Sequence, residues 1–330
     1  MIPAIQVENL HRHFGQLRAV DGVSFEIPAG CVCGFIGSNG AGKTTAMRIL
    51  ATLDYPTHGN VRIGGVDVVE EPWKVRHRLG WMPDHFHVYA HMSVTEFIDF
   101  HARALGFRGA ERRQRVTEVM EFTDLAVIGD RPADKLSKGM TQRLCLGRAL
   151  IHDPEVLILD EPAAGLDPKA RVELKHLIRL LADEGKTIFI SSHILSELGE
   201  MCDSLVFINH GKIVHHGDAQ SLLRHTESNG GILLDVQLAA DPAALAHWCR
   251  MQPNLEFVET TKSGGRLRMA NEDPVQIAAL LARMIKDGLP VIEFHREQRN
   301  LEAAFMEMVS RTAHAPPPLI RPASMEQTKP

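Results

Sequence analysis

The chain has 330 residues, of which 44% are hydrophobic and 23% charged, as in an average soluble globular protein. Lys and Arg number 36 against 41 Asp and Glu, and aromatic residues make up only 5%. A net charge of −5 and few aromatics argue against a surface for phosphate backbones or stacked bases, so we expect no nucleic-acid partner. The length predicts one large domain plus a smaller one, or two domains of moderate size.

The cysteines and the N-terminus indicate a reducing compartment and no export signal. The cysteines are odd in number and form no CxxC pair, which is typical of reduced thiols: Cys31, Cys33, Cys145, Cys202 and Cys249. The first residues lack a basic start followed by an apolar core. No apolar run approaches the roughly 18 residues that span a bilayer, so action at a membrane would require a partner that crosses it.

Residues 1–220 alternate short β-branched strands with helical stretches, the pattern of a largely parallel α/β sheet. Its clearest buried strands are predicted at Cys31–Ile36, Val156–Asp160 and Thr187–Ser191.

Residues 221–310 predict a second, α+β domain, and the proline-rich residues 311–330 a disordered tail. The order β-α-β-β-α-β suggests a ferredoxin-like split unit with a Ser263–Gly265 turn and a closing helix. Its strands are expected at 232–236, 256–260, 266–269 and 291–295, and its helices at 242–251, 274–286 and 301–309.

Residues 37–45 match the phosphate-loop pattern GxxxxGK[ST], between a predicted strand and a predicted helix, Thr44–Leu53. Glycines let successive N–H groups cradle phosphate oxygens, and the helix start adds a positive dipole end. Lys43 supplies a full charge to the phosphates, and the Thr44 hydroxyl can bind Mg²⁺. The predicted nucleotide contacts are Gly37, Ser38, Asn39, Gly40, Ala41, Gly42, Lys43, Thr44 and Thr45.

Two carboxylates, Asp160 and Glu161, end the second buried strand. After a phosphate loop such an Asp holds Mg²⁺, and a neighbouring Glu can accept the proton of the attacking water. The alternative is that Glu161 is a solvated charge. His193 follows another buried strand, and the carboxyl ends of parallel strands share one sheet edge. We therefore expect Lys43, Glu161 and His193 to act together in catalysis.

The stretch Lys135–Leu144 contains Leu136-Ser137-Lys138-Gly139-Met140 and resembles the LSGGQ signature of ATP-binding cassette (ABC) ATPases. Other stretches of that family follow in the expected order over residues 4–220. Phe14 resembles the aromatic that stacks on adenine, Asp84 lies at the Q-loop position, Ala164–Asp167 resembles the D-loop, and His193 resembles the switch histidine.

The resemblance implies a P-loop ATPase domain with a parallel core sheet, an antiparallel N-terminal sheet and a helical signature subdomain. It also implies ATP and Mg²⁺ as cofactors, with Thr44, Asp160 and Asp84 at the metal. In this family two copies pair head to tail, each ATP lying between one phosphate loop and the partner's signature. Ser137, Gly139 and Asp167 would then complete a shared site, in a homodimer or in a pair with a related chain.

Four positions depart from the family pattern: Asp84 replaces an amide, Lys138 a glycine, Met140 a glutamine and Ala164 a serine. None of them removes Lys43, Asp160, Glu161 or His193, so we expect an active ATPase.

Residues after 220, including Asn300–Phe305, resemble the extension of bacterial exporter ATPases of the daunorubicin-resistance and multidrug type, whose permease is a separate polypeptide. The expected function is to energise export of an unknown substrate from the cytoplasmic face of the membrane. Segment 85–107 would dock the permease through Phe86 and Tyr89, unless these are core residues. His85, His87 and His91 are read as a polar loop. The alternatives are a soluble, non-transport ABC ATPase and a degenerate regulatory cassette.

Overall fold

The computed structural model describes residues 2–198, 201–218, 232–239, 241–252, 255–270 and 273–296. We call residues 2–218 the N-terminal unit and residues 232–296 the C-terminal unit. Among the described helices, none is both long and apolar enough to cross a membrane.

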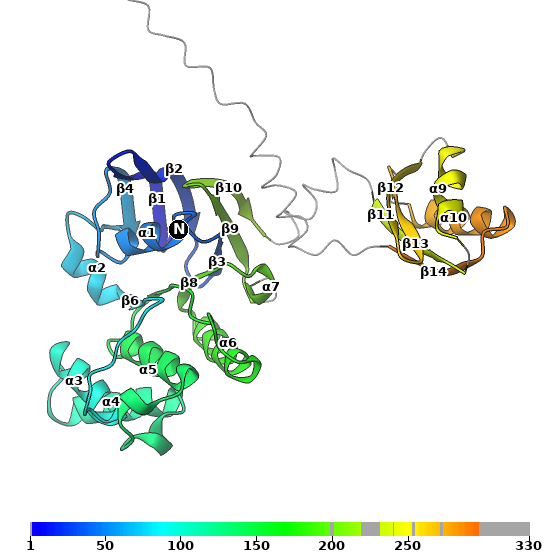
Figure 1. The fold of residues 1–330 in the computed structure, drawn as a ribbon. Helices are drawn as coiled ribbons and strands as arrows, with labels where there is room; N and C mark the ends of the chain where they lie inside the picture. The colour runs from blue at the N-terminus through cyan, green and yellow to red at the C-terminus, as the bar shows by residue number, and fades with distance from the viewer. Residues whose placement is uncertain are drawn as a thin grey trace, which may run out of the picture.

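An antiparallel sheet opens the N-terminal unit, as expected (Figure 1). Its strand order is β2-β1-β4-β5. The strands are β1 (Ile5–Phe14), β2 (Leu17–Ile27), β4 (His58–Ile63) and β5 (Val66–Asp67).

A second sheet carries the motifs and has the order β10-β9-β3-β8-β7-β6. Neighbouring strands from β9 to β6 are parallel, and only β10 runs against its neighbour β9, which confirms the predicted parallel core. The strands are β3 (Val32–Ile36), β6 (Leu79–Met82), β7 (Val156–Leu159), β8 (Thr187–Ser192), β9 (Ser204–Asn209) and β10 (Lys212–Gly217).

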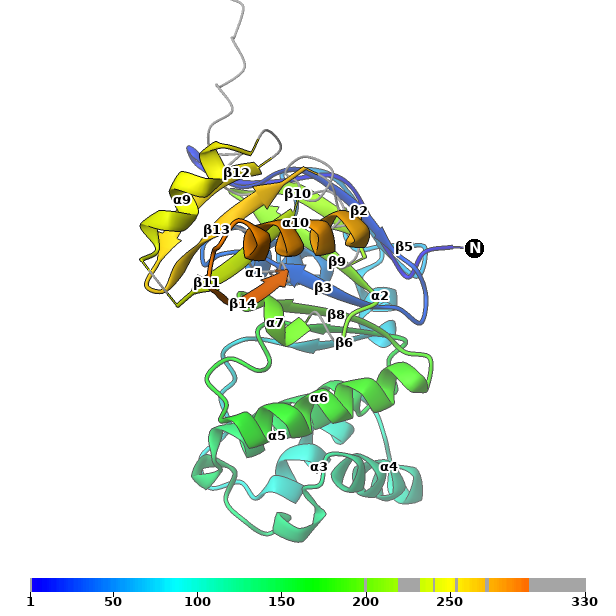
Figure 2. The ribbon, with the colours of Figure 1, turned by 90° about the vertical axis from the view of Figure 1, so that its right-hand side faces the viewer.

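Helix α1 (Lys43–Leu50) is slightly shorter than predicted and packs between the two sheets, because Ala46, Met47 and Ile49 share one core with both. Helices α3, α4 and α5 gather at one end of the unit, beyond β6–β8, as the helical subdomain (Figures 1 and 2). The other bounds are α2 (Pro72–Arg78), α3 (Val94–Ala104), α4 (Gly109–Phe122), η1 (Ala126–Ile128), η2 (Ala133–Lys135), α5 (Lys138–Leu150), α6 (Pro168–Asp183) and α7 (Leu195–Leu198).

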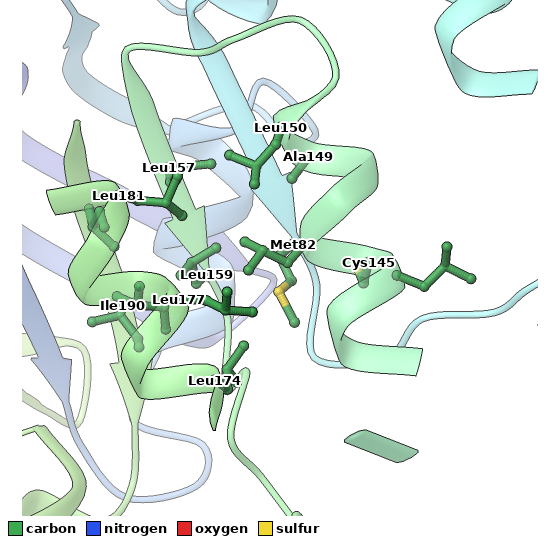
Figure 3. Close-up of a cluster of buried hydrophobic side chains, with 14 of the residues drawn as sticks. Met82, Cys145, Ala149, Leu150, Leu157, Leu159, Leu174, Leu177, Leu181 and Ile190 are labelled. Carbon is green, nitrogen blue, oxygen red and sulfur yellow. The ribbon is translucent and has the colours of Figure 1, made fainter. Parts of the chain in front are cut away.

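The core beneath the motifs joins α5 and α6 to the parallel sheet (Figure 3). Leu174, Leu177 and Leu181 recur at helical spacing on α6 and lie with Leu157 and Leu159 of β7 in one buried cluster. This packing holds the start of α5, with the signature, in a fixed relation to the ends of β7 and β8.

The C-terminal unit has the predicted order β-α-β-β-α-β, and its antiparallel sheet, β12-β13-β11-β14, has ferredoxin-like strand order. Its elements are β11 (Ile232–Leu238), α9 (Ala243–Arg250), β12 (Leu255–Thr261), β13 (Gly264–Met269), α10 (Pro274–Lys286) and β14 (Val291–Arg296).

The predicted turn at residues 263–265 is wrong at two of its three positions, since Gly264 and Gly265 belong to strand β13. A Cβ on Gly264 would lie 1.9 Å from the Val236 carbonyl oxygen of β11, so glycine allows this close strand approach. The predicted closing helix 301–309, the tail 311–330 and the domain boundaries at 220 and 310 lie outside the described residues.

Candidate active site

The loop between β3 and α1 needs glycine at particular positions. Gly42 has a φ of 107°, in the left-handed region, and a Cβ there would lie 2.3 Å from the Ala19 carbonyl oxygen. A Cβ on Gly37 would lie 2.4 Å from the carbonyl oxygen of Ile208. Any side chain at either position would displace the loop, whose path ends at the N-terminus of α1, a natural anion site.

Lys43, the first residue of α1, is buried and extends back over this loop. Its Nζ donates to the carbonyl oxygens of Gly37, at 2.7 Å, and of Ser38, at 3.4 Å. The same ammonium lies 3.1 Å from Glu161 Oε1. The packing of β3 against β8, and of β8 against β7, therefore brings the phosphate-loop cation to the carboxylate predicted to act as base.

Asp160 and Glu161 follow β7, and a hydroxyl of the neighbouring strand β8 holds both. Ser191 Oγ donates to Asp160 Oδ1 at 2.7 Å and accepts from the Glu161 backbone N–H at 2.8 Å. Glu161 has a φ of 49°, rare for a residue with a side chain, and this bond supports it. Sequence reasoning missed Ser191, because only the order of strands in the sheet places it beside Asp160.

Asp160 is 1% exposed, and this burial raises the pKa of its carboxyl above the usual range. The hydroxyls of Ser191 and Thr44 oppose the rise by hydrogen bonding to the carboxylate, and the nearby carboxylates of Asp84 and Glu161 add to it. The structure thus brings Thr44, Asp84 and Asp160 together, as expected.

His193 follows β8 and completes a row of three charged or titratable groups. Its Nδ1 lies 2.8 Å from Glu161 Oε2, while Lys43 approaches the other oxygen. The Glu161 side chain is 11% exposed, so its carboxylate is largely shielded from solvent. Lys43 and His193 contact its two oxygens, one each. The ends of β3, β7 and β8 converge as predicted.

The donor set fits Mg²⁺. Asp160 Oδ2 is buried and, in the described part of the chain, has no hydrogen-bond partner. The Thr44 hydroxyl contacts the same carboxylate, and Asp84 lies close enough to influence it. Hydroxyl and carboxylate oxygens are the ligands that Mg²⁺ prefers.

Phe14, the last residue of β1 and the predicted adenine contact, is 47% exposed. The Arg12 guanidinium carbon lies 4.4 Å from its ring centroid, a cation–π contact that orients the ring.

The signature and D-loop residues are held by helix capping. The Ser137 hydroxyl caps α5 by accepting from the N–H of Met140, and Asp167 caps α6 by accepting from the N–H of Ala170 at 2.9 Å. Gly139 lies close to Ala170, since a Cβ there would be 2.9 Å from that of Ala170. The backbone N–H groups at the start of α5 follow the exposed Ser137.

Lys138 contacts the D-loop of its own chain. A Cβ on Gly165 would lie 2.5 Å from Lys138 Nζ, so the ammonium rests on the Gly165 backbone. The sequence shows Lys138 only as a replacement of the family's glycine and does not predict this contact.

The two aromatic residues of segment 85–107 differ in role. Phe86 packs edge-on against Phe97, at 5.6 Å between centroids, and beneath Arg148, so it belongs to the subdomain core. Tyr89 is 56% exposed and contacts Phe97 and Phe100 with one side of its ring. Of the two, Tyr89 is the one available to a partner.

Comparison with known proteins gives consistent matches. The family model described as "ABC transporter" matches residues 20–164. The Nod factor export ATP-binding protein I of Ralstonia nicotianae is 32% identical over 310 residues, 94% of each chain. The daunorubicin/doxorubicin resistance ATP-binding protein DrrA of Streptomyces peucetius is 31% identical over 313 residues, covering 94% of this chain and 93% of that protein.

Solved structures agree on the fold. The subunit cbiO1 from Clostridium perfringens, part of the ABC transporter complex cbiONQ, has a TM-score of 0.62 and 27% identity over 69% of this chain and 93% of its own. The ATP-binding cassette MJ0796, in a dimeric structure with ADP and phosphate, has a TM-score of 0.59 and 24% identity over 65% of this chain and 98% of its own.

Proposed function

The chain belongs to the ABC transporter family of ATP-binding subunits, and we propose that it hydrolyses ATP as a dimer to energise export through a separate membrane permease. The observation that carries this proposal is the Glu161 carboxylate, held between Lys43 and His193 above the phosphate loop.

The groups at the site divide the chemical work. The loop N–H groups, the start of α1 and the Lys43 ammonium hold the β- and γ-phosphates, while Phe14 stacks on the adenine. Mg²⁺, held by Thr44 and Asp160 with Asp84 beside them, would supply positive charge to the phosphate oxygens. Glu161 accepts the proton of the attacking water, and His193 orients the Glu161 carboxylate.

The second half of each site comes from a partner copy. The exposed hydroxyl of Ser137 and the N–H groups around Gly139 form an anion site at the start of α5, directed at the partner's γ-phosphate. Asp167, capping α6, positions the adjoining D-loop at the same interface. The homodimer is therefore closed by two shared nucleotides.

The permease is proposed as a separate polypeptide, with this chain bound at the cytoplasmic face of the membrane. The named relatives serve export of Nod factor or resistance to daunorubicin and doxorubicin, and the described helices of this chain include none that could span a bilayer. Tyr89 and Phe100, both exposed and in mutual contact, are the aromatic anchors proposed for the docking surface.

The test uses the hydrolysis-deficient variant Glu161→Gln to trap the closed dimer. With ATP and Mg²⁺ this variant should elute as a dimer in size-exclusion chromatography with light scattering, and its turnover should fall at least about 100-fold. Adding Ser137→Arg should leave it monomeric while nucleotide still binds. Unchanged hydrolysis in Glu161→Gln would refute its role as base, and a dimer in the double variant would refute the shared site.

A degenerate regulatory cassette is the competing function. The purified chain should hydrolyse ATP in the presence of Mg²⁺; a chain that binds ATP and does not hydrolyse it would favour the competitor.

A further inference from the structure

Three side chains on the β1–β2 hairpin bring their ligand atoms together. His11 and His13 lie two residues apart on β1, and Asp21 of β2 is the register partner of His11. Asp21 Oδ1 lies 3.2 Å from His11 Nδ1 and 3.9 Å from His13 Nε2. All three atoms lie within 4.8 Å of one another, and the described residues contain no other such group of His, Cys, Asp or Glu.

The surroundings of His11 call for a cation at this point. Its Nε2 lies 3.1 Å from Asn9 Oδ1, and its Nδ1 faces Asp21 Oδ1, so both ring nitrogens face acceptor oxygens. A neutral imidazole has one N–H and satisfies only one of them. A second proton on the ring or a metal ion on Nδ1 resolves this mismatch, since a metal-bound histidine donates its other N–H to just such an oxygen.

His13 adds an independent observation. Its Nε2 is buried, with no hydrogen-bond partner among the residues that the structure describes, and it faces the same Asp21 oxygen. Leaving such a nitrogen unpaired is costly, so a ligand for it is expected.

The two oxygens of the Asp21 carboxylate face different neighbours. Its Oδ2 faces Arg18 Nη1 and Lys212 Nζ, each at 3.6 Å, whereas its Oδ1 faces the two imidazoles. The two cations therefore orient the carboxylate and leave Oδ1 for a further positive charge. The three ligand side chains keep 15% to 27% of their surface exposed, which gives an ion access from solvent.

We propose that His11, His13 and Asp21 bind a divalent transition-metal ion, with Zn²⁺ as the best match. Two imidazole nitrogens and one carboxylate oxygen are typical zinc ligands, and tetrahedral bonds of about 2.0–2.1 Å separate ligand atoms by about 3.4 Å. The observed 3.2 Å and 3.9 Å to Asp21 Oδ1 lie close to this value, and the two imidazole nitrogens lie within 4.8 Å of each other, so side-chain shifts can close the site. His58, opposite His11 on β4, or a water completes the coordination.

This site is distinct from the proposed Mg²⁺ site at Asp160 and stands independently of the proposed function. Its consequence is local: the ion cross-links β1 and β2 beside Phe14, which directly follows His13.

The experiment titrates Zn²⁺ into the metal-stripped full-length chain, with a chromophoric chelator as competitor and excess Mg²⁺ to fill oxygen-ligand sites. The double variant His11→Gln/His13→Gln is compared with His77→Gln/His176→Gln, which removes two exposed histidines from α2 and α6. We expect one tight equivalent in the wild type and the control, and at least tenfold weaker binding in the first variant. Equal binding by both variants would overturn the proposal.

A measurement on the wild type removes dependence on how the variant folds. Diethylpyrocarbonate modifies accessible histidines, and peptide mass spectrometry locates each modification. One equivalent of Zn²⁺ should protect His11 and His13 and leave His77 and His176 reactive. Unchanged modification of His11 and His13 at saturating Zn²⁺ would refute the site.

Discussion

Replacing Ser191 by alanine should destabilise the N-terminal unit far more than the loss of one hydroxyl usually does. The hydroxyl donates to the buried Asp160 carboxylate and accepts from the Glu161 N–H. A hydrogen bond to a charged group contributes about 1.5–3 kcal/mol, and a buried N–H left without a partner costs about 1–3 kcal/mol. We therefore expect a loss of about 2.5–6 kcal/mol in the free energy of unfolding.

Thr123→Val is the matched control. Thr123 is fully buried, but its hydroxyl donates to the Val119 carbonyl oxygen, which already accepts the Thr123 backbone N–H. Its loss should cost under about 1 kcal/mol, because no buried group is left unpaired. Urea denaturation, followed by circular dichroism and tryptophan fluorescence, compares both variants with the wild type. If Ser191→Ala loses no more than the control, Ser191 does not hold the acidic pair.

Ser191→Ala should also weaken the affinity for Mg²⁺ without abolishing nucleotide binding. Groups that orient metal ligands typically contribute 10- to 100-fold in metal affinity, so the Mg²⁺ concentration for half-maximal hydrolysis should rise by about that factor. An unchanged Mg²⁺ requirement would contradict this role.

Three further substitutions test other parts of the site. Asp160→Asn should stabilise the nucleotide-free chain at neutral pH, because burial raises the pKa of Asp160 and the amide carries no charge. A carboxyl whose pKa is raised in the folded state lowers the stability at pH values above that pKa. The stability difference between variant and wild type should therefore shrink as the pH falls through the folded-state pKa towards 3.8, and urea denaturation at several pH values measures it. His193→Ala should lower ATP turnover at least about tenfold while ATP affinity, read with a fluorescent analogue, changes little, because the ring contacts Glu161; full turnover would exclude the contact from catalysis. Gly42→Ala should abolish nucleotide binding in a chain that stays folded by circular dichroism, because its Cβ would meet the Ala19 carbonyl oxygen; normal ATP affinity would show that the loop tolerates the change.

The sequence alone was sufficient for features made by neighbouring residues. The phosphate loop is a run of contiguous residues whose types follow from backbone curvature and charge, so its spacing predicted both the turn and the Lys43 that follows. The β-α-β-β-α-β order of the C-terminal unit was likewise predictable, because hydrophobic periodicity is a local signal. Gly264 and Gly265 misled the turn prediction, since glycine marks tight turns and close strand approaches alike.

The tertiary structure alone decided which distant side chains meet. Ser191 holds Asp160 because β8 lies next to β7, and that adjacency depends on packing against α5 and α6. His11, His13 and Asp21 converge because the register of the β1–β2 ladder pairs His11 with Asp21, and the residue order alone does not reveal that register. Lys138 reaches Gly165 across two helix starts. Such contacts depend on how sheets and helices pack against one another. That packing is set by many residues acting together, so no local stretch of the sequence predicts a given contact.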